Sequence, residues 1–480
     1  MNRLTIPRRC LTTMTDYYKL IETKFNNRIF EGIPADGVTV SEKLFDFQQA
    51  IVKWALRKGR ACVFADCGLG KTPVQLEWAR NVHQTTGKPV LIVAPLAVSA
   101  QTVHEGKKFD VEVNFCRTKE DVVNGINITN YESLAKFEPS VFVGVVLDES
   151  SILKSYTGKT KRQIIESFAN TKYRLCCTAT PAPNNLMELL NHAEFLGVMK
   201  SSEALAIWFI NDTSTMGNYR LKHNATKSFY EWVSSWAVCL STPSDVGFKN
   251  DGFILPPLTE VNHIVQTEQT CTGDRLFRSQ EISATTMFEE KRRTLNERVE
   301  KAIEIVNSTE NQMVVWCETN DEATLLKKAL ADCKGGSVEV RGNHSVEFKE
   351  QSAMDFIAGK YRVLISKPSI FGFGLNFQNC HDCVFVSMSY SFEGYYQAVR
   401  RFWRFGQNLP VTIHRVIADT EYNILTAIER KQKQKNDVQE TIASIVKDIQ
   451  TANLNGQYYK LNITREKFIF PEWIKEEAVC

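Results

Sequence analysis

Eight residues near the start of the chain have the composition and spacing of a phosphate-binding loop. They read ADCGLGKT, from Ala65 to Thr72, and follow a short apolar run. Gly68 and Gly70 allow the backbone to turn tightly, so that its N–H groups can point at phosphate oxygens beside the positive end of a helix dipole. Lys71 would reach the β- and γ-phosphates, and the Thr72 hydroxyl would hold Mg²⁺. The sequence therefore predicts a nucleotide site, although Ala65 replaces the first glycine of the full pattern G-x-x-x-x-G-K-[ST].

A second candidate group is the carboxylate pair Asp148 and Glu149, which ends the apolar run VVLDE. The carboxyl ends of parallel strands meet at one edge of a sheet, and ligands bind there. One carboxylate could hold Mg²⁺ while the other orients or deprotonates water. An Asp-Glu pair after a strand is more often a solvated loop, but its place downstream of a phosphate loop favours catalysis.

Three side chains further along share one face of a predicted helix. Gln397, Arg401 and Arg404 fall at i, i+4 and i+7. In isolation this pattern is best interpreted as a solvated basic face. An arginine pair on one helix face is also what a neighbouring domain needs to approach a γ-phosphate. Gly372 and Gly374, in SKPSIFGFGLNF, permit a close backbone approach at the end of another strand.

Two sheets are needed to position these residues. From Arg60 to about Gly197 apolar runs alternate with helical stretches, which predicts a parallel sheet covered on both faces. A second alternating set begins at residue 312, after a charged helix around 288–306, and has no phosphate loop of its own. We therefore predict an α/β protein with two parallel-sheet domains. The expected segments are an N-terminal extension (1–40), a first domain (41–200), a mostly helical insert (201–258), a second domain (259–435) and a C-terminal tail (436–480).

Three segments have more than one interpretation. Residues 198–258 interleave aromatic with basic residues, which could form a stacking and phosphate surface for nucleic acid. Trp232 and Trp236 lie one helical turn apart, however, which favours packing in a core. Cys380 and Cys383 form a single C-x-x-C, and without a second pair this is a weak zinc signal. The tail contains a predicted helix to about residue 450 and indicates no role beyond packing or a partner contact.

Composition limits the class of protein. The 480 residues are 43% hydrophobic and 24% charged, which is typical of a globular chain with two to four domains. The net charge is only +3, so any nucleic-acid site must be local. Thirteen scattered cysteines fit reduced thiols better than a disulfide framework. The longest apolar runs are far too short to cross a bilayer. We therefore expect a cytoplasmic protein without a membrane partner.

Taken together, the motifs resemble those of superfamily-two helicases, and among them the Swi/Snf-type translocases. LFDFQQAIVKW resembles the helix whose glutamine, here Gln48, reads adenine, although the pattern alone favours a surface residue of a helix. PLAVSAQTV and ITNYESL resemble the segments that touch the nucleic-acid backbone, and CTATPAPNNLMELL resembles the coupling motif. SIFGFGLNF and QAVRRFWRFGQ resemble the fifth motif and the arginine-finger motif. The match covers roughly residues 44–200 and 310–435, and the compact build resembles proteins encoded by bacteriophages and prophages.

The resemblance implies two tandem RecA-like domains with ATP and Mg²⁺ in the cleft between them. The implied nucleotide-binding residues are Gln48, Ala65, Asp66, Cys67, Gly68, Leu69, Gly70, Lys71, Thr72, Gly372 and Gln397. The implied catalytic residues are Lys71, Glu149, Arg401 and Arg404, and the implied Mg²⁺ ligands are Thr72 and Asp148. The implied nucleic-acid contacts are Pro95, Leu96, Ser99, Thr129, Asn130, Ser366 and Lys367, and the implied coupling residues are Thr178 and Thr180.

Two residues depart from the family pattern. Ser151 replaces the usual histidine after the carboxylates, which puts the usual link between ATP state and nucleic-acid grip in doubt. Arg400 stands where an acid is usual and leaves the arginine-finger helix unusually basic. We expect an ATP-driven translocase on nucleic acid, with duplex DNA favoured. Since phosphate contacts position a protein without reading bases, we expect little sequence preference and strong salt dependence.

Three alternatives stay open. A strand-separating DNA or RNA helicase would need a wedge, which the segment 201–258 could contain. A nucleotide-gated binding or recruitment protein would use ATP as a switch and move nothing. The motor half of a restriction or modification system would need a nuclease or methyltransferase on a separate chain, and a replication partner is equally possible. The sequence does not indicate the oligomeric state.

Overall fold

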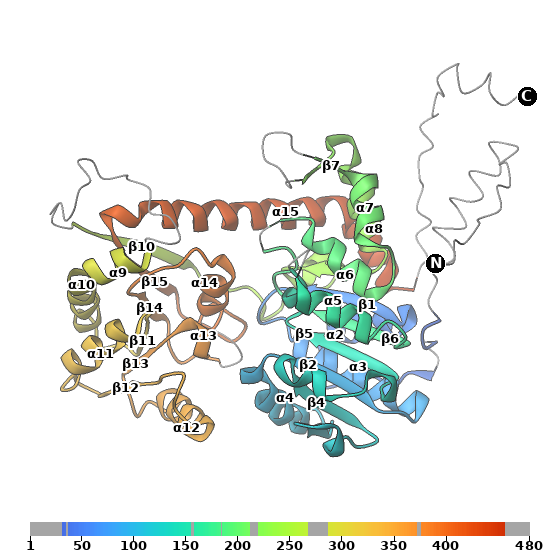
Figure 1. Cartoon of the computed structure of the whole chain (residues 1–480), viewed down its shortest axis with the longest axis horizontal. Helices are drawn as coiled ribbons and strands as arrows, with labels where there is room; N and C mark the ends of the chain where they lie inside the picture. The colour runs from blue at the N-terminus through green and yellow to red at the C-terminus, as the bar shows by residue number, and fades with distance from the viewer. Residues whose placement is uncertain are drawn as a thin grey trace, which may run out of the picture.

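Two parallel β-sheets organise the chain, one in each of two domains (Figure 1). The computed structural model describes residues 31–34, 37–154, 158–183, 185–211, 219–266, 287–371 and 376–456. The domain with the seven-stranded sheet is called the first domain below, and the domain with the six-stranded sheet is called the second. The predicted fold class is confirmed. Within the described residues, no helix has both the length and the apolar character that spanning a membrane requires.

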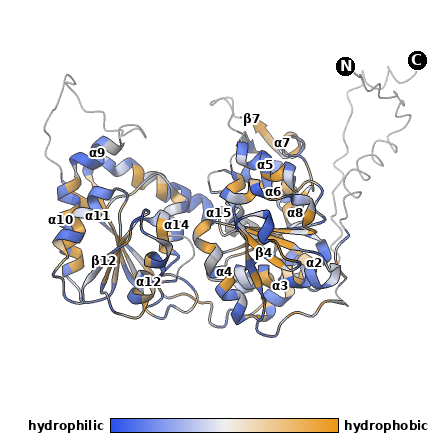
Figure 2. Cartoon of the chain, turned by 60° about the horizontal axis from the view of Figure 1, so that its bottom comes forward, coloured by the Kyte–Doolittle hydropathy of each residue, from blue (hydrophilic) through white to orange (hydrophobic). Residues whose placement is uncertain are grey.

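The first sheet consists of short apolar strands that are buried on both faces, because helices cover each side. One face packs against α2 (Asp46–Lys58), α3 (Lys71–Thr86) and α4 (Leu96–Lys108). The other face packs against α5 (Lys159–Ser167) and α6 (Glu188–Leu196). The apolar strands between polar helix surfaces are visible in Figure 2. The strand order is β3 (Val113–Phe115), β4 (Ile126–Asn130), β2 (Val90–Ala94), β5 (Gly144–Asp148), β6 (Tyr173–Cys177), β1 (Arg60–Ala65) and β9 (Ala237–Leu240).

The second sheet is also parallel throughout. Its faces are covered by α10 (Leu295–Asn307) and α11 (Asn320–Ala329) on one side, and by α12 (Val346–Ile357) and α14 (Phe392–Val399) on the other. The strand order is β10 (Leu258–Val265), β15 (Val411–Ala418), β14 (Asp382–Phe385), β11 (Met313–Trp316), β13 (Val363–Ser366) and β12 (Ser337–Glu339).

Strand β10 corrects the expected start of the second set of strands at residue 312. It pairs with β15 along its whole length, from Leu258 to Val265. Sequence reasoning missed it because polar residues such as Glu260, Asn262 and His263 interrupt its apolar pattern. Such a pattern is typical of an edge strand that has a neighbour on one side only and is partly exposed.

The segment after residue 200 contains helices and strands. It forms α7 (Ser201–Trp208), the antiparallel pair β7 (Phe209–Asn211) and β8 (Tyr219–Leu221), and α8 (Thr226–Ser234), before β9 joins the first sheet beside β1. Its aromatic residues are buried except for Tyr219, which is half-buried, and the rings of Trp208 and Trp232 stack with their centroids 4.5 Å apart. The core interpretation of Trp232 and Trp236 is thereby confirmed, and the stacking surface for nucleic acid is not supported there.

One long helix connects the two domains. α15 (Tyr422–Leu454) begins against the second sheet and runs over the first domain (Figure 1). Val446 and Ile449 enter the core of the first domain. The carboxamide of Gln450 pairs with the backbone of Cys239 in β9, accepting from its N–H at 2.6 Å and donating to its carbonyl at 3.2 Å. The end of α15 is further held by Arg57, which donates to the carbonyl of Leu454.

Candidate active site

The predicted phosphate loop lies between the end of β1 and the start of α3. Gly68 and Gly70 have φ values of 89° and 75°, in the left-handed region that favours glycine. The N-terminus of α3 has no side-chain cap, so its first N–H groups are available to an anion. The Lys71 ammonium donates to the carbonyl of Ala65 at 3.1 Å. Burial opposes its charge, but Cys67, Glu149 and other acidic groups nearby outweigh this effect and raise the pKa of Lys71.

Gln48 lies directly beside this loop. Its Nε2 donates to the carbonyl of Leu69 at 3.0 Å, and its Oε1 accepts from the N–H of Phe45 at 3.0 Å. A Cβ at Gly70 would meet Nε2 of Gln48 at 2.2 Å, so glycine is required there on steric grounds as well. Gln48 is buried, which excludes the surface-residue interpretation.

Asp148 ends β5 and Glu149 follows it, and both carboxyl groups interact with the charge of Lys71. Oδ1 of Asp148 accepts from Nε2 of Gln75 at 2.6 Å and from the N–H of Glu149 at 3.1 Å. Burial raises the pKa of both carboxyl groups, and the charge of Lys71 acts against this rise. Glu149 is one of the non-glycine residues with a positive φ, at 49°. Such a backbone is strained, and strained residues cluster at functional sites.

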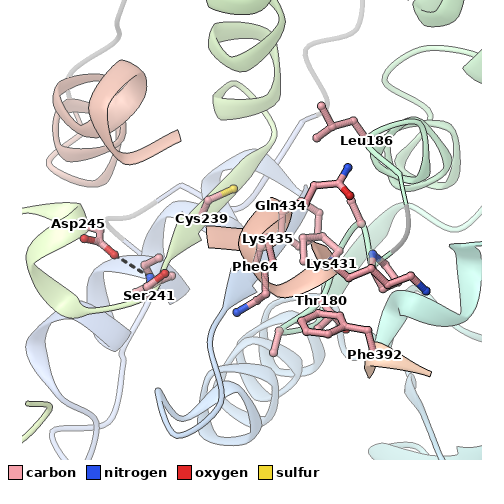
Figure 3. Close-up of a pocket in the computed structure, with 15 residues that line it drawn as sticks. Phe64, Thr180, Leu186, Cys239, Ser241, Asp245, Phe392, Lys431, Gln434 and Lys435 are labelled. Carbon is pink, nitrogen blue, oxygen red and sulfur yellow. Dashed lines mark hydrogen bonds between the residues drawn. The ribbon is translucent and has the colours of Figure 1, made fainter. Parts of the chain in front are cut away.

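The expected coupling residues follow β6 and contact the carboxylate pair. Oγ1 of Thr178 donates to Oε2 of Glu149 at 3.3 Å and accepts from the N–H of Thr180 at 3.1 Å. The Thr180 hydroxyl is buried and has no hydrogen-bond partner among the described residues. It lines a pocket between the domains, together with Phe64 near the end of β1 (Figure 3). Apolar residues that follow β6 form one wall of this pocket, and Lys431 and Lys435 of α15 form another.

The second domain supplies the arginines. α14 ends at Val399, so Arg401 and Arg404 lie in the turn after it and do not share a helix face with Gln397 as predicted. Arg401 is buried, and its positive charge acts to lower the pKa values of Asp148 and Glu149. Arg404 donates to Oδ1 of Asn376. Burial, together with the neighbouring charge of Arg401, lowers the pKa of Arg404 to about 10. These arginines therefore lie in one cleft with the phosphate loop and the carboxylates.

Gln397 and the turn after Arg404 complete the second domain's side of the cleft. Gln397 is 1% exposed, and neither end of its amide has a partner among the described residues. A Cβ at Gly68 would lie 2.9 Å from the backbone N of Phe405, so this turn rests directly on the phosphate loop. The Phe405 ring stacks on that of Phe253 at a centroid distance of 4.6 Å. Gly372 and Gly374 lie outside the described residues.

The expected nucleic-acid residues lie at the carboxyl ends of strands in both domains, but few have free side chains. Leu96 is 61% exposed, and Lys367 is half-buried. Ser99 and Ser366 are buried and donate to backbone carbonyls, and Oδ1 of Asn130 accepts from the N–H of Ser133. The remaining two are Pro95, which is half-buried at the start of α4, and Thr129, which is fully buried.

Sequence reasoning missed the partners of Asp66. The structure pairs this phosphate-loop carboxylate with Arg400, Tyr396 and Lys435 of the second domain and α15. The signal available in the sequence was the unusual Arg400, but its acidic partner could not be identified from spacing.

Comparisons with known proteins agree with this arrangement. Residues 47–228 match the SNF2-related domain, and residues 294–406 match the helicase conserved C-terminal domain. The chain is therefore an ATP-hydrolysing enzyme of the helicase type. Within that class, it carries the SNF2-related domain found in SWI/SNF-type ATPases.

Relatives of two kinds are similar to the chain. Protein p41 of Acyrthosiphon pisum secondary endosymbiont phage 1 is 21% identical over 457 residues, which cover 81% of this chain and 95% of the phage protein. The ISWI chromatin-remodeling complex ATPase CHR17 of Arabidopsis thaliana is 29% identical over 199 residues, which cover 35% of this chain and 18% of that protein. The SWI/SNF chromatin-remodeling complex subunit snf22 of Schizosaccharomyces pombe is 24% identical over 40% of this chain and 13% of its own length. The chain thus spans less than a fifth of these eukaryotic relatives.

Among solved structures, the SWI2/SNF2 ATPase core of Sulfolobus solfataricus in complex with dsDNA aligns with 87% of this chain and 98% of that chain. The TM-score is 0.41 and the sequence identity is 16%. The assignment above rests on the two domain matches and not on this superposition.

Proposed function

We propose that this protein is an ATP-driven translocase that moves along nucleic acid, with duplex DNA as the favoured track. The observation that carries the proposal is the cleft between two domains, where Tyr396 of α14 contacts Asp66 of the phosphate loop, Glu393 of α14 contacts Ser151 beside the carboxylate pair, and Arg401 is buried. The SNF2-related domain supports a translocating rather than a strand-separating motor. Two of the relatives are named for chromatin remodelling, and the DNA of chromatin is a duplex.

The residues around the phosphate loop fit a triphosphate with Mg²⁺. Gly68 and Gly70 leave the backbone open to an anion, and Lys71 supplies a positive charge for the β- and γ-phosphates. Thr72 and Asp148 would hold Mg²⁺, which binds proteins through one or two carboxylates together with phosphates and water. Mg²⁺ held by these residues would neutralise charge on the phosphate oxygens. Among the residues described, there is no cluster of three or more His, Cys, Asp or Glu that could bind a metal without a phosphate.

The remaining roles concern the attack of water and the developing charge. Glu149 would orient or deprotonate water, and its raised pKa suits a general base. Arg401 and Arg404 would stabilise the charge of the transferring phosphoryl group from the second domain. Gln48 would read adenine, and Gln397 offers a buried amide that has no hydrogen-bond partner among the described residues. Gly372 is proposed as a further nucleotide contact on the basis of the motif alone.

The nucleic-acid contacts and the residues that couple hydrolysis to movement are proposed from their positions in the fold. Lys367 and the start of α4 at Pro95 and Leu96 could contact phosphates directly, whereas the buried Ser99, Thr129, Asn130 and Ser366 would act through backbone groups. Thr178 would respond to a change at Glu149 through the hydrogen bond between them. Thr180, whose N–H donates to Thr178, would transmit this change toward the pocket between the domains.

The test is ATP turnover without polymer and then with duplex DNA, single-stranded DNA and single-stranded RNA at one low salt concentration. Lys71→Ala and Glu149→Gln serve as inactive controls for contaminating ATPases. We expect duplex DNA to stimulate turnover most, and a triplex-displacement assay then to detect movement. Stimulation mainly by single strands or RNA would instead indicate a strand-separating helicase. An absence of stimulation by every polymer would contradict a motor and favour a nucleotide switch.

A further inference from the structure

Helix α14 carries a charged residue at each end, and both residues contact the first domain. Glu393 lies in the first turn of α14, and Arg400 caps its C-terminus. An acid at the start of a helix and a base at its end agree with the helix dipole. Arg401, the residue that approaches the carboxylate pair, follows immediately. One of these two contact residues is therefore the chain neighbour of Arg401.

At the C-terminal end, the guanidinium of Arg400 forms an ion pair with Asp66 of the phosphate loop. Arg400 and Asp66 are 4% and 7% exposed. The Tyr396 hydroxyl, one turn earlier in α14, donates to the same carboxylate. Lys435 of α15 approaches Asp66 to 3.9 Å and donates to the Tyr396 hydroxyl at 2.7 Å.

This cluster is electrostatically satisfied. Burial acts to raise the pKa of Asp66, but the charges of Arg400 and Lys435 and the hydrogen bond from Tyr396 lower it to about 2. The carboxylate is therefore ionised, and its charged partners, Arg400 and Lys435, lie across the cleft and on α15, while the N–H of Cys67 in its own loop donates to it at 2.8 Å. A buried carboxylate without such partners is very unfavourable. The second domain thus has a defined position against the phosphate loop.

At the N-terminal end, Glu393 contacts the turn that follows the carboxylate pair. Its Oε1 accepts from the Ser151 hydroxyl at 2.6 Å, and its Oε2 accepts from the Lys154 ammonium at 2.6 Å. Ser151 lies two residues after Glu149, and Asp66 lies five residues before Lys71. Each end of α14 is therefore bound to a loop that carries a candidate catalytic residue.

We propose that Arg400 and Glu393 are positioning residues that clamp α14 to the two catalytic loops of the first domain and so place Arg401 for ATP hydrolysis. This inference rests on the proposed role of Arg401 in the reaction. It also gives one explanation for both departures from the family pattern, because Ser151 and Arg400 each form one of the contacts. Neither contact lies within one domain, so their loss should affect the relation between the domains more than the folding of either.

The test compares Arg400→Ala, Arg400→Lys and Glu393→Gln with the wild type. Lys360→Ala is the control, since it removes an exposed ion pair with Asp355 inside the second domain. We would measure kcat and KM for ATP without polymer, the affinity for a non-hydrolysable ATP analogue, and the thermal unfolding temperature. Glu393→Gln keeps an acceptor for Ser151 and lies away from the phosphate loop, so it carries the test if Arg400→Ala does not fold.

We expect kcat to fall by about 10- to 100-fold in Arg400→Ala, as for a catalytic group that is misplaced by about 1 Å. Analogue affinity should stay within a few-fold of the wild type, Arg400→Lys should recover part of the rate, and Lys360→Ala should behave as the wild type. Unchanged kcat in both Arg400→Ala and Glu393→Gln would overturn the proposal. A rise in turnover would also overturn it, since the contacts would then hold the enzyme in an inactive state.

The outcome is separate from that of the proposed function. A wild type that hydrolyses ATP without any response to polymers contradicts the translocase, while a loss of kcat in Arg400→Ala still supports the clamp. A wild type that duplex DNA stimulates, together with variants of normal kcat, supports the translocase and contradicts the clamp.

Discussion

The carboxamide of Gln48 is only half used inside the protein. Its nitrogen has two hydrogens and its oxygen two lone pairs, and one of each is taken by Leu69 and Phe45. Among the described residues no other partner takes its second donor or its second acceptor, and this pair is what adenine requires. The same side chain therefore supports the phosphate loop and can still read a base.

This residue should determine the preference for ATP. We expect Gln48→Ala to reduce the ratio of ATP to GTP affinity by about 10-fold or more, because a bidentate amide contact to adenine contributes about 1–3 kcal/mol of discrimination. Competition binding with the two nucleotides measures this ratio. Gln49→Ala is the matched control, since the Gln49 amide donates to Leu44 instead. An equal loss of affinity for both nucleotides would mean that Gln48 only supports the phosphate loop and does not read the base.

His192 links α6 to the turn beside Glu149. Its Nδ1 lies 3.2 Å from the carbonyl O of Glu188, and its Nε2 lies 3.1 Å from Oγ of Ser150. Since a carbonyl can only accept, Nδ1 carries the proton. Burial lowers the pKa of His192 from 6.5 to about 4, so the ring is neutral in the folded protein at neutral pH.

The free energy of unfolding should therefore depend on pH in the mildly acidic range. Below about pH 6.5 the unfolded chain binds a proton that the folded chain does not, so stability is fully present above this pH and is lost as the pH falls toward 4. A fall in the pKa of His192 from 6.5 to about 4 corresponds to roughly 3 kcal/mol of unfolding free energy. Urea unfolding at several pH values measures the slope, which should be shallower in His192→Gln and unchanged in the control His104→Gln at an exposed position. Equal slopes in all three proteins would contradict a neutral buried ring.

Individual site residues can be predicted best from the sequence where a motif fixes both residue type and spacing. The phosphate loop and the carboxylate pair could be predicted because each follows an apolar strand within a few residues. The pairing of Asp66 with Arg400 could not, since the two residues lie in different domains and only the closed cleft brings them together. Arg400 departs from the family pattern, but residue type alone does not indicate a partner.

At the scale of elements, α15 completes the edge of the first sheet. β9 has β1 on one side only, so the backbone groups on its other side have no neighbouring strand to pair with. The Gln450 carboxamide, which is 1% exposed, pairs with both the N–H and the carbonyl of Cys239 in the way a neighbouring strand would. A helix thus protects the sheet edge through one side chain.

Removing this side chain should destabilise the first domain. We expect Gln450→Ala to lower the free energy of unfolding by about 1–3 kcal/mol, because it leaves backbone groups of Cys239 without partners. Denaturant unfolding followed by circular dichroism measures the loss. Lys447→Ala, at an exposed position one turn earlier, should unfold as the wild type does. If the two variants are equally stable, water replaces the amide and the edge needs no protection.

The elements that sequence reasoning identified are those buried on both faces. Continuous apolar runs such as those of β2 and β5 have only one plausible environment, so a strand in a covered parallel sheet follows from the pattern. β10 lies at a sheet edge, where partial exposure weakens the apolar pattern, and β9, at the edge of the other sheet, is apolar but only four residues long. An edge strand has a neighbouring strand on one side only, and a single sequence does not show which strands pair.

For the whole molecule, the balance of charges limits how the protein can hold a polymer. A net charge of +3 on 480 residues produces little long-range attraction, so binding to DNA must come from a few local contacts. Lys367 is the one residue among the proposed nucleic-acid contacts with a positive charge, and it follows β13 at the carboxyl end of the second sheet. The position of this end relative to the first domain depends on the contacts across the closed cleft, and residue spacing could not predict those contacts.

The salt dependence of binding then counts the phosphates that the protein neutralises. The logarithm of the binding constant for duplex DNA should fall linearly with the logarithm of salt concentration, with a slope of about −0.9 for each phosphate contact. Lys367→Ala should make this slope shallower by about one contact and weaken binding equally for unrelated DNA sequences, since a phosphate contact reads no base. Fluorescence anisotropy with two duplexes of different sequence, from about 50 to 200 mM salt, measures both effects. Lys334→Ala, at an exposed ion pair with Glu310, is the control for the loss of one charge from the second domain. A weaker affinity with an unchanged slope would mean that Lys367 acts on the position of its loop, and the polymer would then be held through backbone groups at the ends of the strands.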